Sequence, residues 1–163
     1  NLRVCSAPEA APLPEPDPND AQRVQVALQG GMMGRMRMAS LDGETLDARS
    51  LFAAGRAWAI NGVAAGSHAL APFATVPRGR SCIIDMVNET AWFHPMHLHG
   101  HSFRVLARDG AVEPARPWRD TVLVAPGERV TVAFVADNPG DWMFHCHVLE
   151  HQAGGMSAIL RVT

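Results

Sequence analysis

The sequence lacks several features that would assign it to a familiar class of protein. Its 163 residues have a formal net charge of -2 at pH 7, so no excess of basic residues favours binding to nucleic acid or to an anionic membrane. No apolar run approaches the roughly 18 residues needed to span a bilayer. The first residues show no basic region followed by an apolar one. We therefore expect no membrane span, no signal peptide and no nucleic-acid partner.

Cysteine is also scarce, with three in the chain. Cys146 lies between two histidines, whereas Cys5 and Cys82 could form a disulfide bond in an oxidising compartment. Alternatively, Cys82 is a small buried apolar residue in a strand, and Cys5 is free or pairs elsewhere. The sequence leaves both alternatives open.

The apolar and charged fractions, 47% and 18%, are those of an ordinary globular domain with a sizeable core. Short segments of alternating or apolar residues, separated by turn sequences, predict many strands. Such a pattern, with only one or two helical turns, predicts an all-β antiparallel sandwich. Residues 40–56 are expected to be irregular, apart from a helical turn at 51–54. The predicted strands cover residues 23–29, 58–60, 74–76, 82–87, 102–107, 121–125, 130–136, 142–147 and 156–162.

Prolines alternate with small or acidic residues from residue 7 to residue 19. Proline has no backbone N–H to contribute to a sheet, and it favours an extended polyproline conformation. We therefore predict a proline-rich linker or tail over residues 1–20, followed by a single folded domain over residues 21–163.

Residues 145–156 contain the strongest chemical pattern in the chain. Cys146, His151 and Met156 offer one thiolate, one imidazole and one thioether. Together with a further histidine, this set of ligands is typical of a blue-copper electron-transfer site.

The histidines on either side of Cys146 lead to a second prediction. Neighbouring side chains of a strand point to opposite faces of the sheet. A strand over residues 142–147 would therefore direct Cys146 to one face, and His145 and His147 to the other. One segment would then contact two different metal centres.

Residues 94–101 repeat this alternation. His97 and His99 lie two residues apart, whereas His94 has the opposite parity. Pro95 is expected to interrupt the hydrogen-bond ladder, which weakens the argument for this second segment.

These two segments resemble the copper-binding motifs of the multicopper oxidases, of laccase-like or copper-tolerance type, and specifically of their last cupredoxin domain. The resemblance extends over roughly residues 56–162 and implies a Greek-key cupredoxin β-sandwich. It also implies a ligand set: His94, Cys146, His151 and Met156 for type 1 copper, His97 for type 2 copper, and His99, His145 and His147 for the type 3 coppers.

The resemblance further implies an oxidase activity. Single electrons from a reductant, either a phenol or Cu(I), would enter near the edge of His151 and pass through Cys146 and its flanking histidines to a trinuclear cluster that reduces O2 to water. This cluster takes eight histidines in the family, and the chain supplies four. We therefore expect N-terminal cupredoxin domains to supply the others, as a separate or cleaved chain, in a periplasmic or secreted protein.

Two other metal assignments compete with this prediction. Zinc is the commoner metal for a cluster of cysteine and histidine, but it closes with four ligands, and the two segments offer more than that. A stand-alone single-copper electron carrier would need only the type 1 ligands. It would leave His97, His99, His145 and His147 without a function. The resemblance does not make His101 a ligand, so we expect a pocket or surface histidine there, and His68 is expected in a solvated loop.

The sequence leaves the proton donor and the reductant open. Several bacterial relatives have an acidic residue directly after the second type 1 histidine, where this chain has Gln152. Glu150 is the nearest carboxylate. Asp120 could take part in proton transfer or form a hydrogen bond at a strand start, and we consider the second role at least as plausible. Met32, Met33, Met36 and Met38 could bind Cu(I) through their thioethers, but we favour the alternative that they fill gaps in the core.

Overall fold

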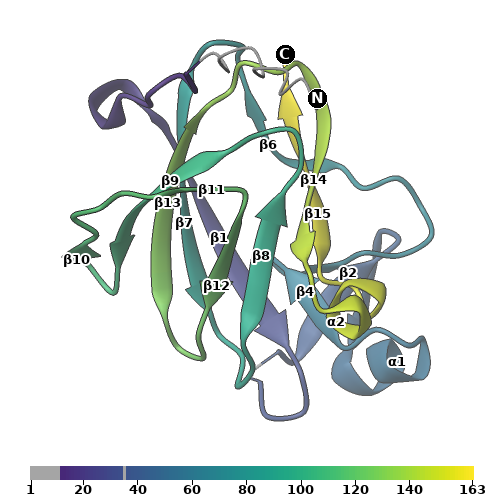
Figure 1. The fold of residues 1–163 in the computed structure, drawn as a ribbon. Coiled ribbons are helices and arrows are strands. Elements are labelled where there is room, and N and C mark those ends of the chain that lie inside the picture. The colour runs from purple at the N-terminus through teal and green to yellow at the C-terminus, as the bar shows by residue number, and fades with distance from the viewer. Residues whose placement is uncertain (1–11, 35) are drawn as a thin grey trace, which may run out of the picture.

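A computed structural model describes residues 12–34 and 36–163 and shows two β-sheets packed face to face (Figure 1). Over these ranges there are fifteen strands, two short α-helices and one 3-10 helix. The prediction of an all-β sandwich is therefore confirmed. Most strand pairs are antiparallel, but β1 with β7, β2 with β5, and β6 with β15 are parallel. No helix in the described ranges is long and apolar enough to cross a membrane.

The larger sheet has ten strands, in the order β10-β9-β13-β7-β1-β4-β5-β2-β3, with β11 paired to β9. Its strands are β1 (Gln22–Gly30), β2 (Met38–Leu41), β3 (Glu44–Asp47), β4 (Trp58–Ile60), β5 (Val63–Ala64), β7 (Ser81–Asn88), β9 (Phe103–Arg108), β10 (Ala111–Val112), β11 (Trp118–Arg119) and β13 (Arg129–Val135).

The smaller sheet has five strands, in the order β12-β8-β14-β15-β6. Figure 1 shows it in front of the larger sheet, with α2 at the lower end of β14 and β15. Its strands are β6 (Pro72–Val76), β8 (His94–Leu98), β12 (Thr121–Val124), β14 (Gly140–Cys146) and β15 (Ser157–Val162). The helices are the 3-10 helix η1 (Pro18–Asp20), α1 (Ala48–Ala53) and α2 (Leu149–Ala153).

The main core lies between the two sheets. Alternate side chains of each strand face inward, as the alternation in the sequence predicts. Cys146 and Met156 belong to this core and are fully buried. Other members are Val26, Leu28, Ile84, Met86, Met96, Leu98, Val132, Phe134, Phe144, Leu160 and Val162. A smaller cluster of Ala39, Leu51, Ala59 and Ala64 packs α1 against the larger sheet.

Nine strands are found within two residues of their predicted ends, and α1 overlaps the predicted helical turn. The expectation of irregular structure over residues 40–56 is wrong, because β2 and β3 form a hairpin there. Asp42 and Gly43 both have positive φ, at 52° and 90°. An Asp-Gly pair with two positive φ values is typical of a two-residue hairpin turn.

The described part of the proline-rich segment lies against the domain. Glu15 forms an ion pair with Arg104 of β9. The backbone N–H of Asp17 donates a hydrogen bond of 2.9 Å to the hydroxyl of Ser81. The possible disulfide between Cys5 and Cys82 involves a residue outside the described ranges, and Cys82 itself is fully buried in β7.

Candidate metal centre

Strands β8 and β14 position most of the predicted ligands. They are antiparallel neighbours, with His97 opposite His145 and Met96 opposite Cys146. Because side chains alternate along each strand, His97 and His145 lie on the outer face of the smaller sheet. Met96 and Cys146 face the core, where both are fully buried.

The expectation that Pro95 interrupts the ladder is wrong, because β8 runs through it. The register with β14 begins at Met96, so the missing N–H of Pro95 falls outside this pairing. Its carbonyl accepts a hydrogen bond of 2.8 Å from the N–H of His147. His94 therefore shares the parity of Met96 and is also buried.

The inner group consists of His94, Cys146 and His151, whose ligand atoms all lie within 4.8 Å of one another. The Cys146 Sγ is 3.6 Å from His94 Nδ1 and 3.7 Å from His151 Nδ1. The two Nδ1 atoms are 3.1 Å apart. The structure thus brings together three residues that come from the start of β8, the end of β14 and α2.

Met156 lies beside this group because the chain folds back after β14. Its N–H donates to the carbonyl of His151 at 2.9 Å, and its carbonyl accepts from the N–H of Cys146 at 3.2 Å. The side chain is fully buried in the core. The backbone of Met156 is therefore paired with that of Cys146, and both side chains belong to the same core cluster.

Burial controls the protonation of the inner group. It lowers the pKa of His94 to about 4, and the neighbouring His151 adds to this lowering. Burial also lowers the pKa of His151, against the opposing effect of Glu150. The pKa of the Cys146 thiol is raised by burial, against a smaller lowering by the backbone N–H of Val148. Both imidazoles are therefore neutral at pH 7, and a metal ion that binds the Cys146 sulfur would displace the thiol proton.

The outer group consists of His97, His99, His145 and His147, on the opposite side of the same strand pair. His97 is central, with ring centroids 4.8 Å from His99, 5.6 Å from His145 and 4.8 Å from His147. His99 Nε2 and His145 Nε2 are 3.0 Å apart. The structure thus gathers these four predicted ligands at one place.

Hydrogen bonds set the tautomers of two outer-group rings. His97 Nδ1 donates to the carbonyl of Asp120 at 2.8 Å, and His145 Nδ1 donates to the carbonyl of Cys146 at 2.9 Å. A carbonyl oxygen can only accept, so each Nδ1 carries the hydrogen. Each Nε2 is left with a lone pair, which is the form that binds a metal ion.

Both groups fit the copper ions that the sequence predicts. An ion bonded at about 2.0 Å to nitrogen and about 2.3 Å to sulfur holds its ligand atoms roughly 3–4 Å apart. The separations of 3.1, 3.6 and 3.7 Å within the inner group have this size. A thiolate with two imidazoles and a nearby thioether favours copper, and the all-imidazole outer group also suits it.

Two further side chains complete the inner group, and neither was predicted. Trp58 of β4 packs its ring against His151, with centroids 4.2 Å apart, and against His94 at 5.1 Å. The hydroxyl of Thr90 lies 2.7 Å from His94 Nε2. Thr90 lies two residues after Asn88, a spacing at which polar side chains often bond locally. No local signal in the sequence links Trp58 to the histidines.

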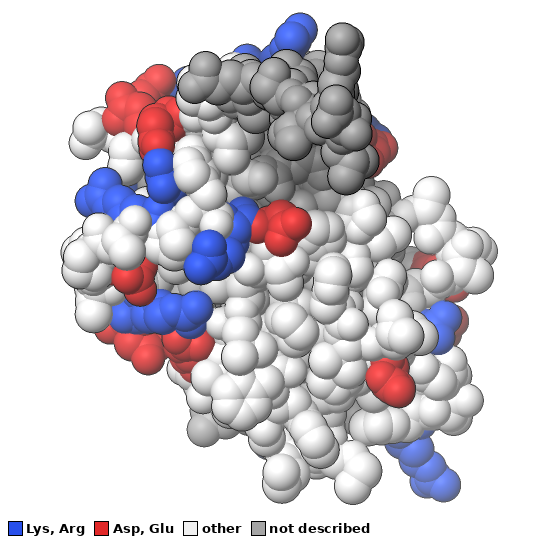
Figure 2. Space-filling view, viewed as in Figure 1, with Lys and Arg blue, Asp and Glu red and all other residues white. Residues whose placement is uncertain are grey.

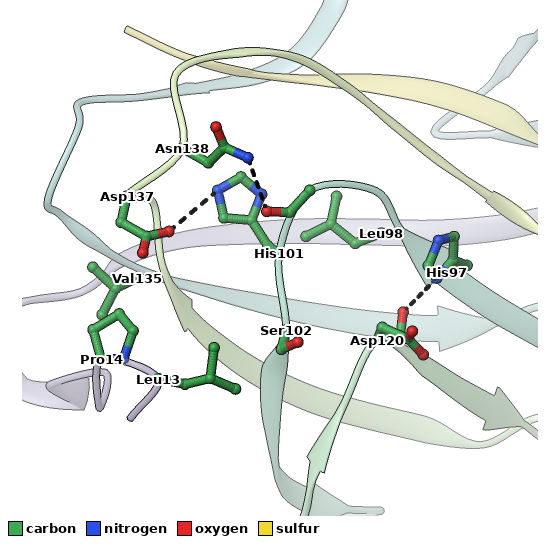
Figure 3. Close-up of a pocket in the computed structure, with 11 residues that line it drawn as sticks. Leu13, Pro14, His97, Leu98, His101, Ser102, Asp120, Val135, Asp137 and Asn138 are labelled. Atoms are coloured by element: carbon green, nitrogen blue, oxygen red, sulfur yellow. Dashed lines mark hydrogen bonds and ion pairs between the residues drawn. The ribbon is translucent and has the colours of Figure 1, made fainter. Parts of the chain in front are cut away.

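His101 and His68 lie outside both groups, as predicted. His101 packs against Phe134 and Trp142 and lines a cavity of about 500 Å³. Figure 3 shows His97 farther along the same cavity. His68 is exposed beside Asp42.

The three residues at positions considered for proton delivery have different surroundings. Glu150 is exposed, while Gln152 donates a hydrogen bond of 3.7 Å to the Met143 sulfur. Asp120 contacts His97 through its backbone carbonyl. The predicted position of Asp120 at a strand start is confirmed, because β12 begins at the next residue.

The interpretation that the four methionines fill gaps in the core is wrong for three of them. Met32, Met33 and Met38 are 87%, 73% and 58% exposed, so they do not fill gaps in the core. Met36 is the exception, because it is partly buried against the smaller cluster. The loop between β1 and β2 thus presents two thioethers to solvent.

The sequence matches a family model described as multicopper oxidase over residues 44–163. Multicopper oxidase MmcO of Mycobacterium tuberculosis is 39% identical over 108 residues, which cover 63% of this chain and 19% of that protein. Laccase-1 of Melanocarpus albomyces is 44% identical over 84 residues, which cover 39% of this chain and 14% of that protein. The chain thus spans less than a fifth of the length of either relative.

Solved structures match almost the whole chain. A multicopper oxidase from Pseudomonas thermotolerans is similar with a TM-score of 0.66 and 29% identity, over 97% of this chain and 33% of that chain. McoA from the hyperthermophile Aquifex aeolicus is similar with a TM-score of 0.68 and 27% identity, over 94% of this chain and 32% of that chain. The sandwich therefore corresponds to about one third of each larger structure.

Proposed function

Since the chain belongs to the multicopper oxidase family, we propose that it is the last cupredoxin domain of a larger copper-dependent oxidase. The observation that carries this proposal is the arrangement at β14, where Cys146 joins the inner group and the adjacent His145 joins the outer group. One strand thereby connects two sets of metal ligands by a single peptide bond.

The inner group and Met156 would hold type 1 copper. When bound, copper supplies one-electron redox chemistry, and its preference for soft ligands agrees with a thiolate and a thioether. His151 lies on α2 and is partly exposed, so its ring edge is the point at which an electron from a reductant would enter. Cys146 is covalently bonded through the backbone to His145 and His147, which provides a short path to the outer group.

The outer group would hold half of a trinuclear centre, with His97 as the type 2 ligand and His99, His145 and His147 as type 3 ligands. The other half would come from an N-terminal partner domain docked on this face. Figure 2 shows that the centre of this face, over β8 and β12, is almost free of charged side chains. Leu123 of β12 is 50% exposed. An exposed apolar face of this kind favours a protein partner.

Substituting Cys146→Ser tests the type 1 assignment. The copper-loaded chain should lose its intense thiolate-to-copper absorption, because a hydroxyl cannot replace the thiolate donor. Cys82→Ser is the matched control, since Cys82 is equally buried but lies in the larger sheet. It should keep the absorption. Survival of the colour in Cys146→Ser, or its loss in Cys82→Ser alone, would eliminate the assignment.

A stand-alone electron carrier is not favoured, because it gives no function to the outer group. The number of copper ions bound per assembly distinguishes the oxidase from the carrier. We expect four copper ions per assembly when an N-terminal partner is present, and reduction of O2 to water. One copper ion per chain under the same conditions, with no gain from the partner, would favour the carrier. As for its location, we propose that the oxidase is periplasmic or secreted, which is the expectation from the family resemblance.

The exposed methionines favour Cu(I) as a reductant over a phenol. Thioethers on a solvent-exposed loop are accessible to a soft monovalent ion. Replacing Met32, Met33, Met36 and Met38 together by leucine in the assembled oxidase should lower the rate of Cu(I) oxidation and leave phenol oxidation unchanged. Equal losses with both substrates would show that the methionines act on stability alone.

A further inference from the structure

A buried hydrogen-bond network lies on the side of His94 that faces away from Cys146. His94 Nε2 is 2.7 Å from Thr90 Oγ1, and Thr90 Oγ1 is 2.8 Å from the side-chain oxygen of Asn88. The exposed fractions of Asn88, Thr90 and His94 are 1%, 6% and 0%. With no access to bulk water, each polar atom must find its partner within the network.

The amide of Asn88 has a fixed orientation. Its Nδ2 lies near three backbone carbonyls, those of Trp92 at 2.7 Å, Ala125 at 3.0 Å and Val124 at 3.1 Å. Carbonyl oxygens only accept hydrogen bonds, so the donating nitrogen must be on this side. The Oδ1 atom therefore faces Thr90, where it accepts from the Thr90 N–H at 3.0 Å and from the hydroxyl.

This orientation offers the hydroxyl hydrogen of Thr90 an acceptor on the side away from His94. The hydroxyl can donate to Asn88 Oδ1 at 2.8 Å or to the Trp92 carbonyl at 3.3 Å, whereas His94 Nε2, at 2.7 Å, can accept or donate according to its tautomer. Either acceptor uses the single hydrogen. Thr90 Oγ1 can then only accept, from the N–H of Trp92 at 3.1 Å and from His94.

With the hydroxyl hydrogen directed to Asn88, the hydrogen of the neutral His94 ring lies on Nε2, where it is donated to Thr90 Oγ1. The other ring nitrogen, Nδ1, then carries the lone pair, and it faces Cys146 Sγ and His151 Nδ1. Asn88 also connects β7 of the larger sheet to the end of β12 in the smaller sheet through the Val124 carbonyl. In this arrangement the network favours one tautomer and holds the ring against both sheets.

We propose that Asn88 and Thr90 are positioning residues, which hold His94 in the Nε2–H tautomer with Nδ1 free for the metal ion. The identity of that ion as type 1 copper rests on the proposed function. Partners of this kind fix the orientation of a ligating histidine, and their loss typically weakens metal affinity 10–100-fold.

The tautomer can be measured in the full chain without metal, from the ring 15N chemical shifts of His94 at pH 7. We expect the Nε2–H form in the native sequence. Thr90→Val keeps the branched shape but removes the acceptor, so the hydrogen should move to Nδ1 in part or entirely. Thr90→Ser restores a hydroxyl and should restore the Nε2–H form. Thr131→Val, which removes a hydroxyl bonded to Asp85 at 2.7 Å, is the matched control and should leave His94 unchanged.

The copper-loaded chain provides a second measurement. Thr90→Val should raise the copper dissociation constant about 10–100-fold and shift both the thiolate-to-copper absorption and the reduction potential. Thr90→Ser and Thr131→Val should stay close to the native values. If circular dichroism shows that Thr90→Val does not fold, the tautomers of the native chain and of Thr90→Ser still test the inference.

Two results would overturn the inference: an Nδ1–H tautomer in the native chain, or unchanged affinity, spectrum and potential in a folded Thr90→Val chain. Failure of the copper assignment is distinguishable from either, because the tautomer is measured without copper. If the Cys146→Ser chain keeps its copper colour, the proposed function is refuted, but the tautomer result still stands.

Discussion

Replacing Gly100 with alanine should destabilise the domain by more than its backbone conformation alone requires. Gly100 has a φ of +71°, and a Cβ at this position would lie 2.4 Å from the Trp142 ring. The left-handed conformation costs a non-glycine residue about 1–2 kcal/mol. Overpacking against a held ring costs about 1–3 kcal/mol more. The ring is held because its Nε1 donates to the Asn138 carbonyl at 2.8 Å. The expected total is therefore about 2–5 kcal/mol.

Gly110→Ala is the matched control. Gly110 has a φ of +80°, and a Cβ there would meet nothing within 4 Å. It should cost only the backbone term of about 1–2 kcal/mol. Urea-induced unfolding of both variants, followed by circular dichroism, gives the two free energies. Equal losses in the two variants would show that the Trp142 ring yields without cost, and the argument from close packing would be refuted.

Three further outcomes can be measured. Burial raises the pKa of the Cys82 thiol to about 12. Under reducing conditions at pH 8, iodoacetamide should therefore label Cys82 only after unfolding, as followed by mass spectrometry. Rapid labelling of Cys82 in the folded chain would contradict its burial. Leu51→Ala should cost about 2–5 kcal/mol in urea unfolding, because Leu51 is the fully buried residue by which α1 packs against the larger sheet. A loss below this range would mean that α1 contributes little to the fold. Copper at 100 times its dissociation constant should add about 2.7 kcal/mol and raise the Tm by about 5–11 °C in calorimetry, and an equal rise in Cys146→Ser would rule out binding at the inner group.

Much of the fold could be predicted because its information is local. Alternating apolar residues defined nine strands, and the Asn61-Gly62 and Asp109-Gly110 turns have the positive φ values expected of such pairs. The hairpin at Asp42-Gly43 carries the same signal. It was missed because the flanking strands, β2 and β3, are only four residues long and weakly apolar.

The inner and outer groups could be predicted from the sequence for the same reason. Their spacing lies within two short segments, and strand alternation alone divides them between two faces. The contacts of Trp58 and Asn88 could not be predicted in this way. Trp58 lies 36 residues before His94 in the numbering and reaches it only through sheet packing. The exposure of Met32 and Met33 was also hidden, because composition does not reveal which side of a loop faces solvent.

The opposite orientation of adjacent side chains in β14 limits how the gene for this domain can change length. Inserting or deleting one codon between Phe144 and Cys146 would shift the register against β8 by one residue. Every side chain beyond that point would then exchange faces. The sulfur would leave the interior and an imidazole would enter it, so one event would abolish both sets of donors. Next to this strand, viable changes in length are therefore confined to the bend at residues 137–139.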